Sequence, residues 1–439
     1  MEQKKPKALV VDVNMGYGHQ RTAYPLRGLA PKGRVINANA YEGIEPADKK
    51  IWETTRKFYE AISNFKRVPL IGDFCFGVFN QFQKILEFYP KRDLSKPNFS
   101  VKQIYKTLKK NWGKHLIEKL KDLSEAYSPV KPLPFLTTFF TSAYMAEYFN
   151  YPGEIYCVVC DADIARIWAP LHPHISRIKY FCPNHRTCAR LELYGVKKEN
   201  IFLTGYPLPS ENIGTEEMEI LKKDLENRLL NLDPKRLYFS RYSSLVRKYL
   251  GYLPSQSSHP LTLMFAIGGA GAQKEIAIKV VKSLRRRISR GEIKIILVAG
   301  IKDFVRDYFL EKLKFLGLKN SKQVEILYAE KIDEYFKKFN QHLRTTDILW
   351  TKPSELSFYT ALGLPIIISP SIGSQENFNR EWLLYHHSGK IQGNPDFTDE
   401  WLFDFLERGE FADMAMHGFI EAEKLGIFKI EKIITQNNE

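Results

Sequence analysis

Short apolar runs alternate with longer helical patterns along the chain, and this alternation constrains the fold more than any other feature. Each run is four to seven residues long, which suits a buried strand. Strands that alternate with helices predict parallel sheets joined by crossover helices, so we expect an α/β fold. The runs expected to form strands are residues 8–13, 34–40, 135–140, 156–161, 178–183, 201–207, 261–267, 294–300, 324–329, 347–350 and 364–370.

The two halves of the chain begin in the same way, with a strand, a glycine-rich loop and a helix. In the first half NMGYGHQRTA (14–23) follows the strand at 8–13, and in the second GGAGAQ (268–273) follows the strand at 261–267. A length of 439 residues also exceeds that of one ordinary domain. We therefore expect two Rossmann-like domains that face one another across a cleft, with ligands at the carboxyl ends of the strands.

The expected boundaries follow changes in composition. Residues 1–213 form the first domain, with a basic, aromatic and helical insertion at about 47–125. Residues 214–260 are highly charged and form a linker that carries helices. Residues 261–415 form the second domain, and residues 416–439 a helical tail.

The net charge of +15 is unevenly distributed. The first 140 residues hold 25 Lys and Arg against 13 Asp and Glu, whereas the other 299 hold 40 against 37. Such asymmetry indicates an anionic partner: nucleic acid, an acidic membrane surface or a phosphorylated substrate. Nucleic acid is disfavoured because no helix-turn-helix, zinc-finger or RNP-like pattern is present. With no signal peptide and no apolar stretch of about 18 residues, we expect a cytoplasmic protein.

The basic and aromatic segment at 60–115 has two interpretations. It could lie on an anionic leaflet, where each basic residue adds on the order of 1 kcal/mol. It could equally be a helical subdomain with a buried aromatic face and a solvated basic face. The side chains concerned are Phe74, Phe76, Phe79, Phe82, Phe88, Lys91, Arg92, Lys102, Lys106, Lys109 and Lys110.

The five cysteines are Cys75, Cys157, Cys160, Cys182 and Cys188. An odd number argues against a disulfide framework. CVVC (157–160) and CPNHRTC (182–188) invite a zinc interpretation. Residues three apart on a strand point to opposite faces, however, so we favour small apolar side chains in a core.

Two segments of the second half suit a nucleotide and a sugar. Gly268, Gly269 and Gly271 let the backbone approach a ligand, and the following helix offers free N–H groups to a phosphate. Ser354 can cap a helix whose first turn holds Glu355, and this carboxylate can either accept ribose hydroxyls or complement the helix dipole. Gln375, Glu376 and Asn379 can hold sugar hydroxyls, or form a solvated loop.

Four segments, in order, resemble the GT-B glycosyltransferases, specifically the group of monogalactosyldiacylglycerol synthase and the lipid-linked N-acetylglucosaminyltransferase of peptidoglycan synthesis. NMGYGHQRTA resembles their GxGH loop. VVCDADIARIWAP (158–170) resembles a strand that ends in Asp and is followed by Trp. YFCPNHRTCARLELYGVKKENIFLTGYPL (180–208) resembles the segment that closes on TGxP. TKPSELSFYTALGLPIII with SQENFN resembles the nucleotide-sugar motif and its QExxN.

This resemblance implies transfer of a sugar from a UDP-sugar to a hydroxyl acceptor held by the first domain. It implies no cofactor and no metal, and it favours inversion at the sugar. A lipid or membrane-associated acceptor would bring the protein to the inner membrane face. The implied roles are catalysis by His19 and Asp161; diphosphate binding by Gly268, Gly269 and Gly271; donor binding by Ser354 and Glu355, with Glu355 on the ribose; sugar binding by Gln375, Glu376 and Asn379; and an acceptor-side loop with Gly16, Gly18 and Arg21.

The chain departs from the family pattern in two places. Phe358 occupies the position of the acidic residue of the nucleotide-sugar motif, and Glu355 lies three residues earlier, on the same helical face. After GxGH, QRTAYP replaces the usual small residues, and Arg21 adds charge.

Three rival interpretations remain open. Asp161-Ala162-Asp163 at a strand end matches the metal-binding DxD of GT-A glycosyltransferases. An epimerase or hydrolase of the same fold would process the nucleotide-sugar without an acceptor. A non-catalytic protein would use the basic first third to bind nucleic acid, with a steep salt dependence.

Overall fold

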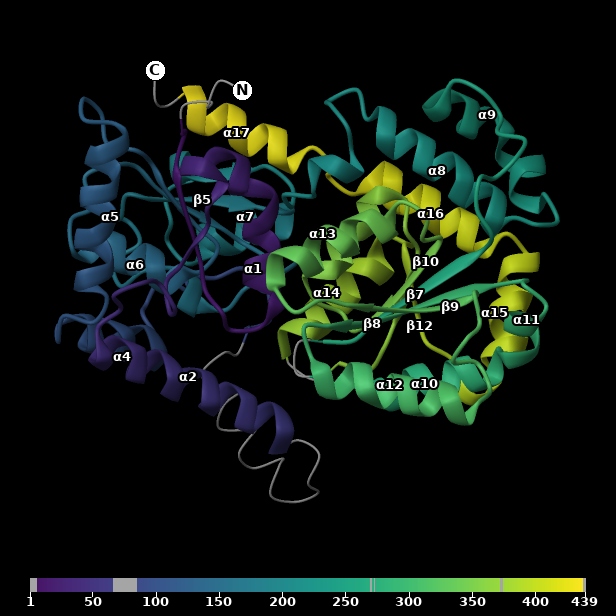
Figure 1. The fold of residues 1–439 in the computed structure, drawn as a ribbon. Coiled ribbons are helices and arrows are strands. Elements are labelled where there is room, and N and C mark those ends of the chain that lie inside the picture. Colours follow the sequence, from purple (N-terminus) through teal and green to yellow (C-terminus); the bar gives the residue numbers. More distant parts are fainter. Residues whose placement is uncertain (1–5, 66–84, 269–270, 272, 372–373, 437–439) are drawn as a thin grey trace. The chain divides into compact units, whose positions relative to one another are not determined.

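The computed structural model describes residues 6–65, 85–268, 271, 273–371 and 374–436. The chain divides into two compact units, each assembled from separate segments. The first unit comprises Met1–Pro207, Ile372–Asn379 and Leu425–Glu439, and the second comprises Leu208–Ser371 and Arg380–Lys424. Figure 1 labels their elements.

The first unit is built on a six-stranded sheet with the order β2-β1-β3-β4-β5-β6. All of its strand pairs are parallel. Its strands are β1 (Leu9–Asp12), β2 (Ile36–Asn37), β3 (Phe135–Thr137), β4 (Ile155–Val158), β5 (Ile178–Cys182) and β6 (Ile201–Leu203). Its helices are α1 (Tyr17–Ala23), α2 (Pro46–Phe65), α4 (Phe99–Leu108), α5 (Lys114–Tyr127), α6 (Phe140–Tyr148), α7 (His185–Leu193) and α17 (Gly426–Gln436).

The second unit holds another six-stranded parallel sheet, with the order β12-β11-β10-β7-β8-β9. Its strands are β7 (Thr262–Ala266), β8 (Lys294–Gly300), β9 (Val324–Tyr328), β10 (Ile348–Thr351), β11 (Ile366–Ile368) and β12 (Gly389–Ile391). Its helices are α8 (Glu219–Leu232), α9 (Leu237–Leu250), α10 (Lys274–Ser283), α11 (Arg285–Ser289), α12 (Asp303–Phe315), α13 (Ile332–Leu343), α15 (Thr398–Glu407) and α16 (Glu410–Glu421), while α14 (Ser374–Tyr385) begins in the first unit and ends in the second. Helices α10 and α12 cover one face of this sheet and α13 the other (Figure 1).

These two sheets confirm the predicted α/β class and its two Rossmann-like domains. All eleven predicted strands are present, because each is an apolar run that a doubly covered sheet can bury. Strands β1, β4 and β7 are buried along their whole length. β12 was not predicted, because GKI is short and only partly apolar.

Each sheet reverses its strand order once, and this reversal marks where a ligand can bind. In the first sheet β1 lies between β2 and β3, so the chain leaves β1 in one direction and returns on its other side. In the second sheet β7 lies in the same way between β8 and β10. The connections diverge at such a switch point, which leaves a crevice outside the carboxyl ends of the strands.

The segment expected to be a linker at 214–260 forms part of the second unit instead. It contains α8 and α9, and the Arg228 side chain of α8 is buried to 1% exposure. The expected C-terminal tail at 416–439 is divided between the units, because α16 belongs to the second and α17 to the first. In the first unit the Lys7 Nζ and Glu431 Oε1 atoms form an ion pair of 2.8 Å.

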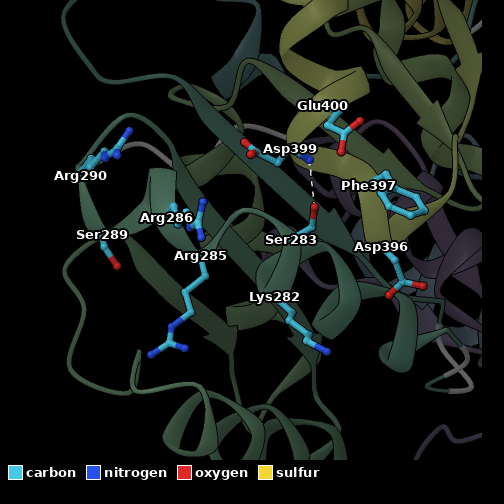
Figure 2. Close-up of a pocket in the computed structure, with 10 residues that line it drawn as sticks. All are labelled: Lys282, Ser283, Arg285, Arg286, Ser289, Arg290, Asp396, Phe397, Asp399 and Glu400. Carbon is cyan, nitrogen blue, oxygen red and sulfur yellow. Dashed lines mark hydrogen bonds between the residues drawn. The ribbon is translucent and has the colours of Figure 1, made fainter.

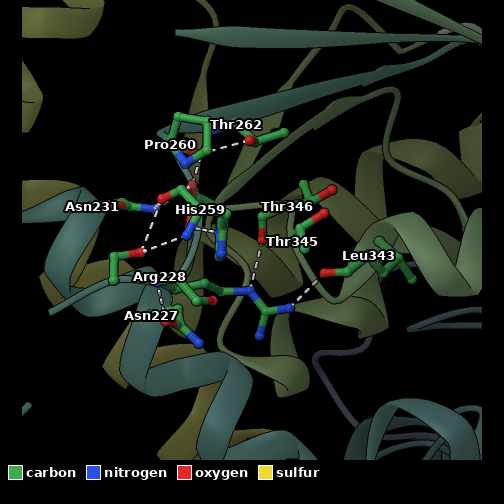
Figure 3. A network of polar contacts seen from close by, with 12 residues as sticks. Asn227, Arg228, Asn231, His259, Pro260, Thr262, Leu343, Thr345 and Thr346 are labelled. Carbon is green, nitrogen blue, oxygen red and sulfur yellow. Dashed lines mark hydrogen bonds and ion pairs between the residues drawn. The ribbon is translucent and has the colours of Figure 1, made fainter. Parts of the chain in front are cut away.

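Arg228 explains why a highly charged segment is integral to the unit (Figure 3). Its guanidinium donates three hydrogen bonds to backbone carbonyls: Nε to Thr346 at 2.7 Å, Nη1 to Leu362 at 2.6 Å and Nη2 to Leu343 at 2.7 Å. Burial lowers the pKa of Arg228. One side chain thus joins α8 to the end of α13 and to the residue that precedes Gly363.

The neighbouring Asp347 carboxylate completes this network. It accepts hydrogen bonds from Asn231 Nδ2 at 3.0 Å and from the Thr262 backbone N–H at 2.8 Å, and His259 Nε2 lies 3.1 Å away. Burial raises the pKa of Asp347, and these partners oppose the shift. The network therefore fixes the start of β7 beside the start of β10.

We predict that Arg228→Met lowers the free energy of unfolding by about 3 kcal/mol, because three buried carbonyls lose their donors. Urea denaturation followed by circular dichroism measures the change. Arg247→Met on α9 is the matched control, since Arg247 is exposed, and it should stay within about 0.5 kcal/mol of the unmodified protein. Equal midpoints for the two variants would contradict the anchoring role.

Candidate active site

The loop after β1 begins the candidate site of the first unit. Gly16 ends this loop with φ 112° and ψ 172° and caps α1. A positive φ of this size favours glycine, which explains why the sequence has Gly16 here. Gly18 and His19 then lie in the first turn of α1, close to the predicted helix start. The site therefore begins at the switch point between β1 and β3.

The His19 imidazole is held across that switch point. Its Nδ1 lies 2.8 Å from the carbonyl oxygen of Thr138, directly after β3. In return, Thr138 Oγ1 donates to the His19 carbonyl at 3.0 Å. Because a carbonyl oxygen only accepts, Nδ1 carries the proton of a neutral ring and Nε2 carries the lone pair. The backbone thus sets the tautomer that can act as a base.

Aromatic rings fix the plane of this imidazole. Phe139 meets it edge-on with ring centroids 4.7 Å apart, and Trp168 lies at 6.4 Å. Cys160 Sγ, after β4, lies 3.5 Å from Nδ1. His19, which follows β1, is therefore oriented by residues that follow the neighbouring strands β3 and β4.

Asp161 follows β4 and is oriented by Asn379. Asn379 Nδ2 donates to Asp161 Oδ1 at 3.1 Å, while Asn379 Oδ1 accepts from the Ala162 backbone N–H at 2.8 Å. The Asn379 side chain is fully buried. The predicted sugar-binding residue Asn379 thus holds the predicted catalytic residue Asp161, and both belong to the first unit.

A cavity of about 380 Å³ brings His19, Asp161 and Gln375 together. Most of its other lining side chains are apolar, and they include Trp52, Trp112, Phe139, Phe140 and Trp168. Trp52 and Trp112 contact one another with ring centroids 4.9 Å apart. The cavity thus brings an imidazole and a carboxylate together with apolar and aromatic side chains.

The remaining predicted residues of the first unit lie in other environments. Arg21 is buried, with 3% of its side chain exposed, so its charge is not presented to solvent. Glu376 is 5% exposed and is not among the residues that line the cavity. Arg21 and Glu376 thus lie on the helices α1 and α14, which carry the cavity residues His19 and Gln375.

Asp163 has a structural partner, which bears on the DxD alternative. Arg190 donates Nε to Asp163 Oδ1 at 2.8 Å and Nη2 to Oδ2 at 2.7 Å, and both side chains are almost fully buried. The Ile164 backbone N–H adds a third hydrogen bond to Oδ1, at 2.9 Å. Both Asp163 oxygens are thus engaged by donors, which disfavours a metal shared between Asp161 and Asp163.

The described cysteines are free thiols in the core or beside it. Cys157, Cys160 and Cys182 are buried and Cys188 is partly exposed, while Cys75 lies outside the described residues. Burial raises the pKa of the Cys157 thiol, as expected for a small side chain in a core. Within the described ranges, no group of three His, Cys, Asp or Glu side chains could hold a metal ion.

The glycine-rich loop of the second unit lies at that unit's own switch point. Gly268 follows β7, and a Cβ atom there would come within 2.7 Å of Lys352 Cε, directly after β10. Gly271 has φ +71°, and a Cβ there would meet Phe304 at 2.7 Å. Gly271 therefore requires glycine, whereas the flexible Lys352 side chain could move away from a Cβ at Gly268. Gly269 lies outside the described residues.

Lys352 follows β10 and lies beside the glycine-rich loop, and the sequence analysis did not predict it as a site residue. A Cβ at Gly268 would lie 2.7 Å from its Cε and 3.6 Å from its Nζ, so its aliphatic stem and its ammonium group lie beside Gly268. Gln273 precedes α10 and donates Nε2 to the Pro370 carbonyl at 2.8 Å. The available signal was TKPSE at the end of a predicted strand, where a lysine faces the carboxyl edge.

Ser354 acts as a helix cap, as predicted. Its side chain accepts from the Leu356 backbone N–H, and the following Glu355–Leu362 segment is a 3₁₀ helix that ends at Gly363 with φ 68°. Glu355 is 9% exposed, and Phe358, in the place of the family's acidic residue, packs against Trp382 with ring centroids 5.0 Å apart. The tighter 3₁₀ turn changes the spacing from Glu355 to Gly363 that an α-helix would give.

The basic segment of the first unit is only partly described. Lys102, Lys106, Lys109 and Lys110 are exposed on and after α4. Phe88 packs under Arg186, whose guanidinium carbon lies 4.1 Å from the ring centroid. Phe74, Phe76, Phe79 and Phe82 lie outside the described residues. Across the described part of the chain, no helix is both long and apolar enough to cross a membrane.

No family model matches this chain, and no curated protein sequence matches it. Solved structures similar to it include proteins of the group that the motifs resemble, and three are described here.

UDP-GlcNAc 2-epimerase from Neisseria meningitidis, bound to UDP-GlcNAc, is 14% identical over 78% of this chain and 83% of its own, with a TM-score of 0.45. MurG of Acinetobacter baumannii is 12% identical over 74% and 77%, with a TM-score of 0.44. A glycosyltransferase from Rickettsia africae is 13% identical over 98% of both chains, with a TM-score of 0.41. All three TM-scores lie below 0.5, and all three identities lie below 25%.

We predict that Asn379→Asp destabilises the first unit by about 2 kcal/mol at neutral pH, because a second carboxylate would face Asp161 in place of a donor. The loss should shrink as the pH falls below about 5, where the two carboxyls can share a proton. Thermal unfolding across this pH range measures both effects. The exposed Asn320→Asp is the control and should leave the transition unchanged; a pH-independent loss in Asn379→Asp would contradict the pairing.

Proposed function

We propose that this chain is a GT-B glycosyltransferase that transfers a sugar from a UDP-sugar to a hydroxyl group of an acceptor. The observation that carries the proposal is the His19 imidazole. It lines the aromatic cavity, and the Thr138 carbonyl fixes it in the tautomer whose Nε2 can take a proton.

The proposed step is a displacement at the anomeric carbon. His19 Nε2 takes the proton of the acceptor hydroxyl as the oxygen attacks. The bond from the anomeric carbon to the donor diphosphate breaks, and UDP departs with the electron pair. Asp161, held by Asn379, either orients the acceptor hydroxyl or serves as the base in place of His19.

The second unit would bind the nucleotide. Gly268 and Gly271 allow a diphosphate to approach the backbone, and Lys352 would supply positive charge beside it. Glu355, capped by Ser354, would accept the ribose hydroxyls. In the first unit Gln375 would contact the transferred sugar at the cavity. We propose that no metal takes part, because Arg190 donates hydrogen bonds to both carboxylate oxygens of Asp163, the second Asp of the DxD sequence.

The apolar lining of the cavity favours a transferase over the donor-only rivals. An epimerase or hydrolase has no acceptor to accommodate, whereas Trp52, Trp112 and Phe140 enclose apolar room next to the base. An acceptor with an apolar portion beside its hydroxyl fits this chamber. The exposed lysines of α4 suit an anionic membrane from which a lipid acceptor would be drawn.

We predict that UDP binds with micromolar affinity, that EDTA leaves binding unchanged, and that GDP, ADP and TDP bind more weakly. Lys352→Ala should weaken UDP binding about tenfold through loss of a charge-assisted contact. The exposed Lys319→Ala of the same unit is the control. Calorimetric titration measures these affinities; absence of binding by every nucleotide, or its loss in EDTA, would contradict the proposed donor site.

We predict that His19→Ala keeps the UDP affinity but lowers transfer about 10²–10⁴-fold, because only the proton acceptor is lost. The assay offers radiolabelled UDP-sugars with hydroxyl acceptors that carry an apolar group. Release of free sugar, or appearance of an epimerised donor without acceptor, would instead support the hydrolase or epimerase.

A further inference from the structure

A second pocket, of about 660 Å³, lies in the second unit and is lined by residues of two helices on one side and of a turn and a helix on the other (Figure 2). One side is formed by the end of α10 and by α11, and the other by the 3₁₀ turn Pro395–Phe397 and the start of α15. α10 begins beside the glycine-rich loop and runs ten residues, about 15 Å, before it reaches this pocket. The pocket is therefore separate from the proposed donor site.

The acidic side chains of the pocket are largely neutralised by protein cations. Lys279 Nζ contacts Asp396 Oδ2 at 2.8 Å, and Arg287 Nε donates to Asp399. The Asp399 backbone N–H donates to Ser283 Oγ at 3.0 Å, which fixes the start of α15 against the end of α10 (Figure 2). Two of the three acidic residues that line the pocket are thus already paired.

The basic side chains of the pocket lack such partners. Lys282, Arg285 and Arg286 form no ion pair with any residue in the described ranges, and Arg290 approaches only Glu292, at 3.7 Å. By contrast, Lys279 of α10, Arg287 of α11 and Lys294 of β8 each form an ion pair. Clustered cations repel one another, so an anion in this pocket would gain from all of them.

We infer that this pocket binds a phosphate monoester group carried by a small molecule or by a lipid head group. Guanidinium groups match phosphate oxygens through paired N–H donors, and α11 with the residue that follows it brings Arg285, Arg286 and Arg290 to one pocket. The volume lies in the range of small-ligand sites and accommodates a phosphate with an attached polyol. An extended nucleic acid fits less well, because Glu400, Asp396 and Asp399 close the opposite side.

The test uses the full chain, with glucose 6-phosphate as a soluble probe and phosphatidylcholine vesicles with or without phosphatidic acid as a membrane probe. Calorimetry and vesicle sedimentation measure binding. The Arg285→Glu/Arg286→Glu variant should weaken binding at least about tenfold, since two favourable charges become repulsive. The control Lys319→Glu/Lys322→Glu changes the net charge equally at exposed positions of the same unit, and should stay within about twofold.

Each outcome decides the inference. Binding of the sugar phosphate by the unmodified protein, or of the vesicles only when they contain phosphatidic acid, supports the site and identifies the source of the phosphate. Absence of binding to both probes overturns it, as does an equal loss in the control variant, which would indicate a general effect of charge. UDP titration of the arginine variant should be unchanged, so failure here is distinguishable from failure of the donor site.

Discussion

The single reversal of strand order in each sheet is the constraint on which the candidate sites depend. A buried parallel sheet leaves polar backbone groups and loops only at its edges, so chemistry gathers where connections diverge. In the first unit this point brings His19, after β1, against Thr138, after β3. In the second it brings Gly268, after β7, against Lys352, after β10. The same topological rule thus places a histidine beside a backbone carbonyl in one unit and a glycine-rich loop beside a lysine in the other.

Buried polar contacts between residues far apart in sequence then make each arrangement rigid. Asp161 is fixed by Asn379, 218 residues later, and Asp163 by Arg190. Arg228 ties α8 to carbonyls more than a hundred residues away. A buried donor or acceptor that loses its partner costs about 1–3 kcal/mol, so each contact restricts the backbone to one conformation. The geometry at His19 and Asp161 depends on such partners as much as on the strands themselves.

Eleven strands were predictable from the sequence because burial on both faces requires a continuous apolar run. β12 was not predicted because its sequence, GKI, contains no such run. The loop positions of Gly16, His19, Gly268 and Ser354 were predictable for the same reason, since each follows such a run. The hydrogen-bond and packing partners of these residues were not predictable from the sequence. Nothing local in QENFN assigns Asn379 to Asp161, and the charge of residues 214–260 conceals the burial of Arg228. Long-range pairing is set by the packed fold, whereas composition reports only the average character of a segment.

The first unit is assembled from three separate segments of the chain, and this connectivity has a consequence for biosynthesis. Residues 372–379 and 425–439 are made after most of the second unit, yet they belong to the first. α17 holds Lys7 through Glu431, and Gly426 approaches the Tyr206 carbonyl so closely that a Cβ would lie 2.3 Å from it. On the ribosome, all six strands of the first sheet would therefore emerge early, whereas the start of α14 and the helix α17 would join their unit only after most of the second unit has been made. The contact of Asn379 with Asp161 is then a late event in folding, although Asp161 itself is made early.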